Sequence, residues 1–169
     1  IGFVFLIPSS MLSSVSALGA QNIGAGKPER AVGTLRYAIC IAVGLGLAVA
    51  GAVQLAAEQL VALFTPDAAV ATAGGQYLRG YIWDCVFGGV QFSFSGYFCA
   101  RGKSGLSFLH NALSILLVRI PGAYLTSLYF PQTLLPMGLA SAAGSLFSSV
   151  VCLIAFALLR RRDRLAEKN

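Results

Sequence analysis

The stretch that decides the fold is YLRGYIWDCVFGGVQFSFSGYFCAR, residues 77–101. It is long and apolar enough to cross a bilayer as a helix, because about 20 residues span the hydrocarbon core. Asp84 interrupts its first half. An ionised Asp near the middle of a membrane helix costs about 2.5 to 3.5 kcal/mol on insertion scales, so such residues usually face a cavity and are functional. We therefore expect Asp84 to face a cavity between helices.

Helical periodicity gives this stretch one polar face. At about 100° per residue, side chains seven and eleven positions apart point in nearly the same direction. Gln91 and Ser95 therefore share the face of Asp84, and Tyr77 and Tyr81 border it. We predict that these four residues line the cavity. The alternative is structural, because a polar stripe can also hold neighbouring helices together, with Asp84 paired to a Tyr, Ser or Arg.

The whole chain has the composition of a polytopic membrane protein. Of its 169 residues, 57% are hydrophobic and 11% are charged, and its mean hydropathy is +0.77. A net charge of +6 would suit nucleic-acid binding, but most charges lie in gaps between apolar runs, as in proteins whose loop charges set membrane orientation. We expect membrane lipids and no nucleic acid as partners. The predicted fold is an all-α bundle of about five transmembrane helices, at 1–20, 35–60, 77–100, 106–130 and 134–159, with a basic tail at 160–169.

The basic residues permit a test of topology. If successive spans alternate in direction, ten of the twelve Lys and Arg residues fall on one side of the membrane. The positive-inside rule makes that side cytoplasmic. We expect a multi-pass protein of the inner or plasma membrane with its carboxyl terminus in the cytoplasm. The ten residues are Lys27, Arg30, Arg36, Arg101, Lys103, Arg160, Arg161, Arg162, Arg164 and Lys168.

The fourth span combines an arginine with a proline. Pro121 has no N–H, so the carbonyl of Leu117 loses its helical donor and the helix is expected to bend there. Arg119 lies two residues before Pro121, near the middle of the span. We predict that Arg119 and Pro121 have a structural role, in which the guanidinium holds loosened carbonyls or pairs with an acid. Direct contact of Arg119 with an anionic group or with Asp84 is the alternative.

Stripes of small residues predict two helix-packing faces. One lies on the second span and the other on the last span. The four cysteines show no CxxC spacing, so we expect neither a disulfide framework nor a zinc site. We expect no cofactor. The two stripes are Cys40, Gly44, Ala48 and Gly51, and Ser141, Gly144, Ser145, Ser148 and Ser149.

Ser95 and His110, the only histidine, flank the turn between the third and fourth spans. A Ser and a His on adjacent membrane helices suggest the dyad of a serine intramembrane protease. Ser95 has no evident oxyanion loop nearby, and a His at a helix start is more simply an interfacial residue. We therefore expect no enzyme, and the protease remains an alternative from a different class.

Several motifs together resemble the multidrug and toxic compound extrusion (MATE) family. None is specific alone, but their order and spacing are, and they cover nearly the whole chain. The chain also begins within an apolar run and without Met, so we expect it to be a fragment. The motifs are SALGAQNIGAGKPERA (16–31), FTPDAAV (64–70), YLRGY (77–81), GYFCARGKSGLSF (96–108) and VRIP (118–121).

This resemblance implies a two-lobe transporter of twelve helices, of which the chain looks like the end of helix eight and helices nine to twelve. It implies export of organic cations or drugs in exchange for Na⁺ or H⁺, with the missing amino-terminal lobe as partner. The family's acidic residue in helix ten matches Asp84, which becomes the candidate cation-coupling residue and Na⁺ ligand. A lipid-linked oligosaccharide flippase of the same superfamily is the alternative.

Overall fold

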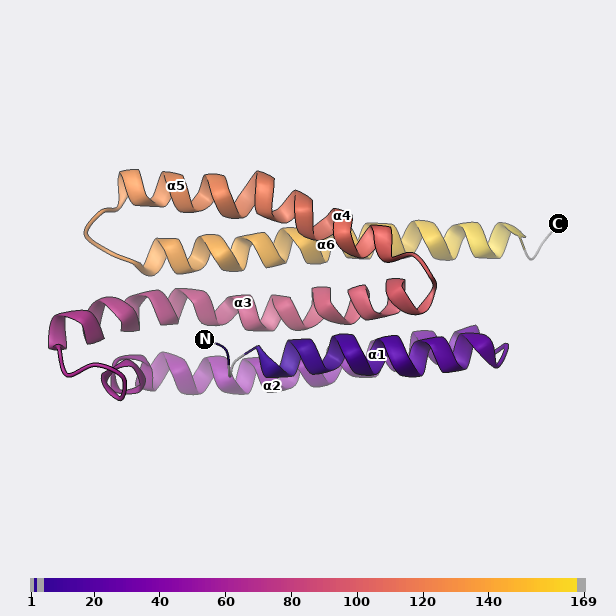
Figure 1. Cartoon of the computed structure of the whole chain (residues 1–169), viewed down its shortest axis with the longest axis horizontal. Coiled ribbons are helices and arrows are strands. Elements are labelled where there is room, and N and C mark those ends of the chain that lie inside the picture. Colours follow the sequence, from indigo (N-terminus) through magenta and orange to yellow (C-terminus); the bar gives the residue numbers. More distant parts are fainter. Residues whose placement is uncertain (1, 3–4, 167–169) are drawn as a thin grey trace.

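The computed structural model describes residues 2 and 5–166, which form an all-α bundle of helices lying side by side (Figure 1). Residues 1, 3 and 4 of the first predicted span and Lys168 of the tail lie outside the described residues. The segments α4, η1 and α5 follow one another without a break and form one continuous helical rod. The described part of the chain therefore has five helical rods, namely α1, α2, α3, α4–η1–α5 and α6. The elements are α1 (Leu6–Gly24), α2 (Pro28–Ala62), α3 (Ala68–Ala100), α4 (Ser104–Ser114), the π-helical η1 (Ile115–Arg119), α5 (Ile120–Tyr129) and α6 (Leu135–Ala166).

The lengths of the helices suit a bilayer. The 35 residues of α2 extend roughly 52 Å at 1.5 Å per residue, whereas the hydrocarbon core is about 30 Å thick. Residues 37–57 of this helix carry no charge and lie between Arg36 and Glu58. Three of the described helices can span a membrane by length and composition, namely Pro28–Ala62, Ser104–Tyr129 and Leu135–Leu165.

The central helix is α3, which contacts α1, α2 and α6. Its apolar side packs on α2, where Ile82 and Val86 form a buried cluster with Val53. Further along, Phe94 and Phe98 pack in a second cluster that includes residues of α1, α2 and α6. Because neighbours cover α3 on several sides, its polar residues are sheltered from lipid. This arrangement explains how a helix with Asp84 at its centre can be the core of a membrane bundle.

Two glycines bring α3 and α6 into backbone contact. A methyl group added at Gly80 would lie 2.9 Å from the backbone nitrogen of Leu139, and one added at Gly138 would lie 2.7 Å from that of Tyr81. Both separations are too short for real carbon atoms, so only hydrogen fits at either position. Close approach through small residues is the usual way in which membrane helices associate.

The two predicted small-residue stripes have different outcomes. The stripe on α6 is a packing face, because Gly144, Ser145, Ser148 and Ser149 are buried. The stripe on α2 is not the face that packs on α3: its four residues are exposed in the described structure, and the face that packs on α3 bears Ala42. The physical reason is that α2 has small residues on both sides, so their spacing alone does not say which side is covered. The outward residues are Cys40, Gly44, Ala48 and Gly51.

Ion pairs tie the helices at one end of the bundle, where the α1–α2 and α3–α4 connections and the end of α6 lie together (Figure 1). Arg101 Nη2 donates to Asp163 Oδ1 at 3.1 Å, and this hydrogen bond raises the pKa of the Arg101 guanidinium. Arg160 Nη2 donates to Glu29 Oε1, also at 3.1 Å. The first pair joins the end of α3 to α6, and the second joins α6 to α2.

We expect Gly138→Ala to destabilise the bundle, because the methyl group would overlap the α3 backbone. Forced overpacking costs about 1 to 3 kcal/mol. The measurement is the thermal unfolding midpoint of the intact purified protein. Gly105→Ala is the control, since nothing lies within 4 Å of a methyl group at that position. Equal midpoints for the two variants would contradict the close α3–α6 contact.

Candidate functional site

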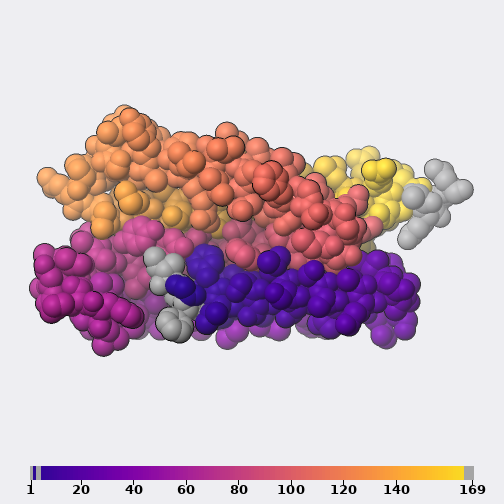
Figure 2. Space-filling view, viewed as in Figure 1, coloured from indigo at the N-terminus to yellow at the C-terminus, as the bar shows by residue number. Residues whose placement is uncertain are grey.

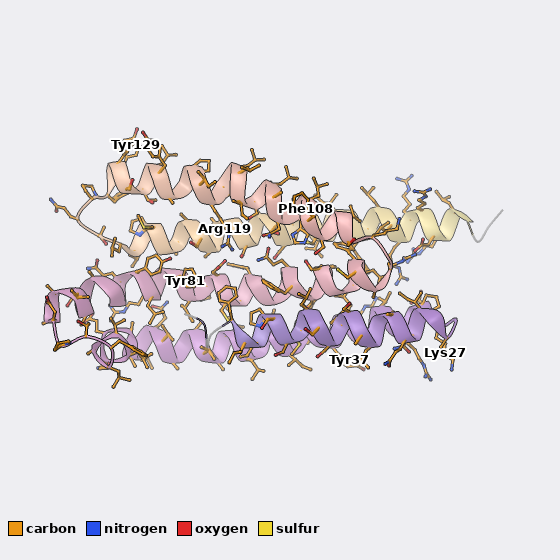
Figure 3. The ribbon with its side chains drawn as sticks, in the orientation of Figure 1. Lys27, Tyr37, Tyr81, Phe108, Arg119 and Tyr129 are labelled. Atoms are coloured by element: carbon orange, nitrogen blue, oxygen red, sulfur yellow. The ribbon has the colours of Figure 1, made fainter. Side chains whose placement is uncertain are left out.

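The polar cluster at the centre of the bundle is built around Asp84. This side chain is fully buried in α3, and its Oδ1 accepts a hydrogen bond from Arg119 Nη2 at 2.9 Å. Arg119 is the last residue of the π-helical turn η1, and its side chain is 30% exposed. Figure 3 shows Arg119 and Tyr81 on facing elements in the middle of the bundle. The cluster therefore contains one buried negative charge paired with one partly exposed positive charge.

Helix α6 completes this cluster through Ser145. Its Oγ accepts a hydrogen bond from Arg119 Nη2 at 2.7 Å and another from Gln91 Nε2 at 2.9 Å. Gly144, the preceding residue, gives the Arg119 side chain room, because a methyl group there would lie 2.9 Å from Arg119 Nε. Three elements, α3, η1 and α6, thus meet at one polar point. We refer to Asp84, Gln91, Arg119 and Ser145 as the central cluster.

The central cluster leaves three buried polar atoms without a hydrogen-bond partner in the described residues. They are Asp84 Oδ2, Gln91 Oε1 and Arg119 Nε. An unpaired buried polar group costs about 1 to 3 kcal/mol, and proteins leave few of them. Two acceptors and one donor therefore remain available for another polar group. Among the described residues no group of three His, Cys, Asp or Glu side chains is placed to hold a metal ion.

The structure brings Asp84 and Arg119 together, which is the structural alternative considered for Asp84. The carboxylate does not face open space in this conformation, because its side chain has 0% exposure. Gln91 and Ser95, predicted to share its face, line a cavity of about 190 Å³ together with Leu12, Phe92, Ser107, His110 and Asn111.

The two predicted tyrosines lie next to each other on α3. The rings of Tyr77 and Tyr81 stack with their centroids 5.4 Å apart. The helical rod made of α4, η1 and α5 changes direction along its length (Figure 1), and its irregular segment is the π-helical turn that ends at Arg119, two residues before Pro121. A π-helical turn inside an α-helix often marks a functional position. The bend and the arginine that contacts Asp84 are therefore adjacent in the chain.

Ser95 and His110 are in contact. Ser95 Oγ lies 2.8 Å from His110 Nε2, and Ser148 Oγ lies 2.6 Å from His110 Nδ1. The histidine is buried and so bridges α3 to α6 with both ring nitrogens in use. The spacing of small residues on α6 predicts packing for Ser145 and Ser148 but does not predict their hydrogen bonds. The only available signal was that their stripe contains hydroxyl groups rather than alanines.

Removing Arg119 should destabilise the protein more than removing both charges of the pair. Breaking a buried pair from one side costs about 3 to 5 kcal/mol, because the remaining charge has no partner. We expect the lower part of that range for Arg119→Gln, since its guanidinium is partly exposed. The double variant Asp84→Asn/Arg119→Gln should recover much of the loss. Thermal unfolding of the intact protein measures both, and a double variant no more stable than Arg119→Gln would argue against the pair.

Comparison with known proteins gives the family. The MatE family model matches residues 1–125. One similar solved structure is described as the inward-facing conformation of a multidrug resistance MATE family transporter of the MOP superfamily. It aligns with 99% of this chain at a TM-score of 0.81 and 20% sequence identity, and this chain covers 38% of its length. At this identity the likeness shows the fold. No curated protein matches the chain.

The matched region covers most of the chain and includes Asp84 and Arg119. The predicted fold class is confirmed, because the all-α arrangement is that of part of a MATE transporter. MATE proteins are membrane transporters and not enzymes, so the contact between Ser95 and His110 is a structural hydrogen bond and no protease dyad is inferred from it. The protein from which this chain comes is a multi-pass membrane protein, and the chain belongs to the MatE family.

Proposed function

We propose that this chain is part of a secondary antiporter that exports organic cations in exchange for Na⁺ or H⁺, with Asp84 as the coupling carboxylate. One observation carries the proposal: the buried Asp84 already binds a cation, the guanidinium of Arg119, at 2.9 Å. An acidic residue buried in a membrane helix is usually functional. The fold, which is that of part of a MATE transporter, supplies the class of protein.

The exchange follows from the charge on one carboxylate. Asp84 can neutralise one positive charge at a time, so Arg119, a coupling ion and a cationic substrate compete for it. Asp84 Oδ2 and Gln91 Oε1 accept no hydrogen bond from the described residues, although Ser145 and Tyr81 lie near the carboxylate. Oxygen atoms of these two kinds bind hard cations. Arg119 would then act as a tethered cation that occupies the carboxylate when no other cation is bound.

Release of Asp84 requires Arg119 to move, and the helix that carries Arg119 is suited to movement. Pro121, which cannot donate a backbone hydrogen bond, lies two residues after the end of the π-helical turn 115–119. Bends of membrane helices concentrate at such positions. Binding of the coupling ion would free Arg119 and favour a different bend, so one binding event could shift the lobes between two orientations.

The cavity beside Gln91 and Ser95 is our candidate for part of the substrate path. Its volume of about 190 Å³ is smaller than the roughly 300 to 1,000 Å³ of sites for drug-sized ligands. A whole substrate therefore needs space from the missing lobe or from another conformation. Tyr77 and Tyr81 offer aromatic faces on the same helix, and such faces attract organic cations.

We propose that the end of the bundle with the Arg101–Asp163 and Arg160–Glu29 pairs faces the cytoplasm of a cell membrane. The connections that carry most of the basic residues meet at this end, together with the end of α6 (Figure 1). The positive-inside rule places such an end in the cytoplasm. The carboxyl terminus would then be cytoplasmic.

The flippase alternative fits the central cluster less well. A flippase that carries a lipid pyrophosphate needs positive charge that is free to bind phosphate. Arg119 lies deep in the bundle, but its charge is balanced by Asp84. A balanced pair with spare oxygen atoms favours a cation as the ligand.

Asp84→Asn in the full-length transporter should reduce ion-driven ethidium efflux at least tenfold, because the amide cannot balance a cation. Efflux is measured in vesicles under an imposed Na⁺ gradient and, separately, under a pH gradient, which also identifies the coupling ion. Asp67→Asn is the matched control, since Asp67 only caps α3 by accepting from the Ala69 and Val70 nitrogens. Normal efflux by Asp84→Asn under both gradients would reject the proposed role.

A further inference from the structure

A large hollow lies at the proposed cytoplasmic end of the bundle, between α2 and α6. Its volume is about 710 Å³, and four arginines from two helices converge on it. We propose that this hollow binds the phosphate headgroup of an anionic lipid of the surrounding leaflet. We refer to it as the arginine hollow, lined by Arg36, Phe156, Arg160, Arg161, Arg164 and Leu165.

The charge of the arginine hollow is largely uncompensated. Arg160 pairs with Glu29 at 3.1 Å, whereas Arg36, Arg161 and Arg164 form no salt bridge within the described residues. Among the residues that the structure describes, no acidic side chain lines the hollow. Several guanidinium groups facing one space favour a phosphate ligand, because a guanidinium can donate two parallel hydrogen bonds to phosphate oxygens.

A neighbouring cavity provides a comparison within the same molecule. It has a volume of about 370 Å³ and is lined by Arg101, Arg160 and Arg164, but also by Glu29 and Asp163. Those two acids engage Arg160 and Arg101. Positive charge on that side is therefore satisfied by the protein itself. The difference between the two cavities makes the arginine hollow the one that needs an outside anion.

The arginine hollow lies at the depth where lipid phosphates are expected. The uncharged stretch 37–57 of α2 extends roughly 32 Å at 1.5 Å per residue, close to the thickness of about 30 Å of the hydrocarbon core. Arg36, which begins this stretch, therefore marks the border of the core. On α6 the first charged residue is Arg160, so both walls of the hollow change from apolar to basic at this border.

The apolar part of the lining favours a lipid over a free anion. Phe156 and Leu165 line the hollow beside the arginines, and Leu165 is 57% exposed. Figure 2 shows the end of α6 projecting beyond α4. An acyl chain can lie along the apolar side chains while its phosphate contacts the guanidinium groups. Basic pockets between helices at the cytoplasmic face bind anionic headgroups in this way.

Membrane orientation alone does not explain the arrangement. The positive-inside rule requires basic residues near the cytoplasmic end but not their convergence from two helices. Arg30 and Arg162 satisfy the rule equally well, and neither lines the hollow. Arg162 is exposed and lies in the same turn of α6 as Arg161. It is therefore a matched control for charge, helix and depth.

Native mass spectrometry of the full-length transporter in detergent, titrated with short-chain phosphatidylglycerol, tests the proposal. Arg36→Gln, Arg161→Gln and Arg164→Gln should each weaken binding about fivefold, the change that corresponds to about 1 kcal/mol per arginine near an anionic surface. Arg30→Gln and Arg162→Gln should bind as the unaltered protein does. Phosphatidylcholine should bind weakly to all of them, with no difference between variants.

Two results would overturn the proposal. Equal loss of binding in Arg162→Gln and Arg36→Gln would mean that the surface attracts anionic lipid diffusely. If inorganic phosphate at the same ionic strength bound to the hollow as tightly as phosphatidylglycerol does, the site would be one for free phosphate. Thermal unfolding in phosphatidylcholine checks that each variant is folded, and Arg36→Lys retains the charge if Arg36→Gln is unstable. Asp84→Asn should bind phosphatidylglycerol normally, so this test is independent of the coupling mechanism.

Discussion

The ion pair between Asp84 and Arg119 is the constraint on which the bundle depends. A carboxylate with no exposed surface loses its hydration, at a cost of several kcal/mol per ion, and here it recovers part of that cost through one guanidinium at 2.9 Å. The guanidinium reaches it only because Gly144 leaves space on α6 and because η1 ends at Arg119. The wider turn of a π-helix changes the direction of every later side chain, so the local irregularity and the central contact belong together.

Polar contacts and small residues hold the remaining helices around this pair. Lipid tails are as apolar as leucine, so contact between apolar side chains provides little free energy for the association of membrane helices. The α3–α6 interface accordingly uses Gly80 and Gly138 for close approach. Elsewhere it uses hydroxyl groups, as where Ser149 Oγ donates to the Phe87 carbonyl oxygen at 3.1 Å. The contact of His110 with Ser95 and Ser148 extends the polar interface towards the α3–α4 connection.

Much of the architecture could be predicted from the sequence. Long apolar runs separated by short segments of Gly, Pro and charged residues can form few structures in a membrane other than a bundle of spanning helices. The polar face of α3 and the bend before Pro121 followed from helical spacing and from the missing proline N–H. The partner of Asp84 could not be selected, since spacing along one helix does not show what lies opposite. For the same reason the spacing of small residues on α2 does not show which of its faces packs on α3. The hydrogen bonds of Ser145 and Ser148 depended on distant helices and were not visible in the chain.

The position of the ion pairs gives the bundle an uneven stiffness. The central pair has a fully buried carboxylate and a partly exposed guanidinium, whereas the carboxylates of the Glu58–Arg79, Arg101–Asp163 and Glu29–Arg160 pairs are all exposed. Dissolved salt screens exposed charges much more than enclosed ones. Raised ionic strength should therefore loosen both ends of this segment and leave its middle fixed. The two ends of the segment would then move more freely than its middle, where the buried Asp84 carboxylate holds α3 and η1 together.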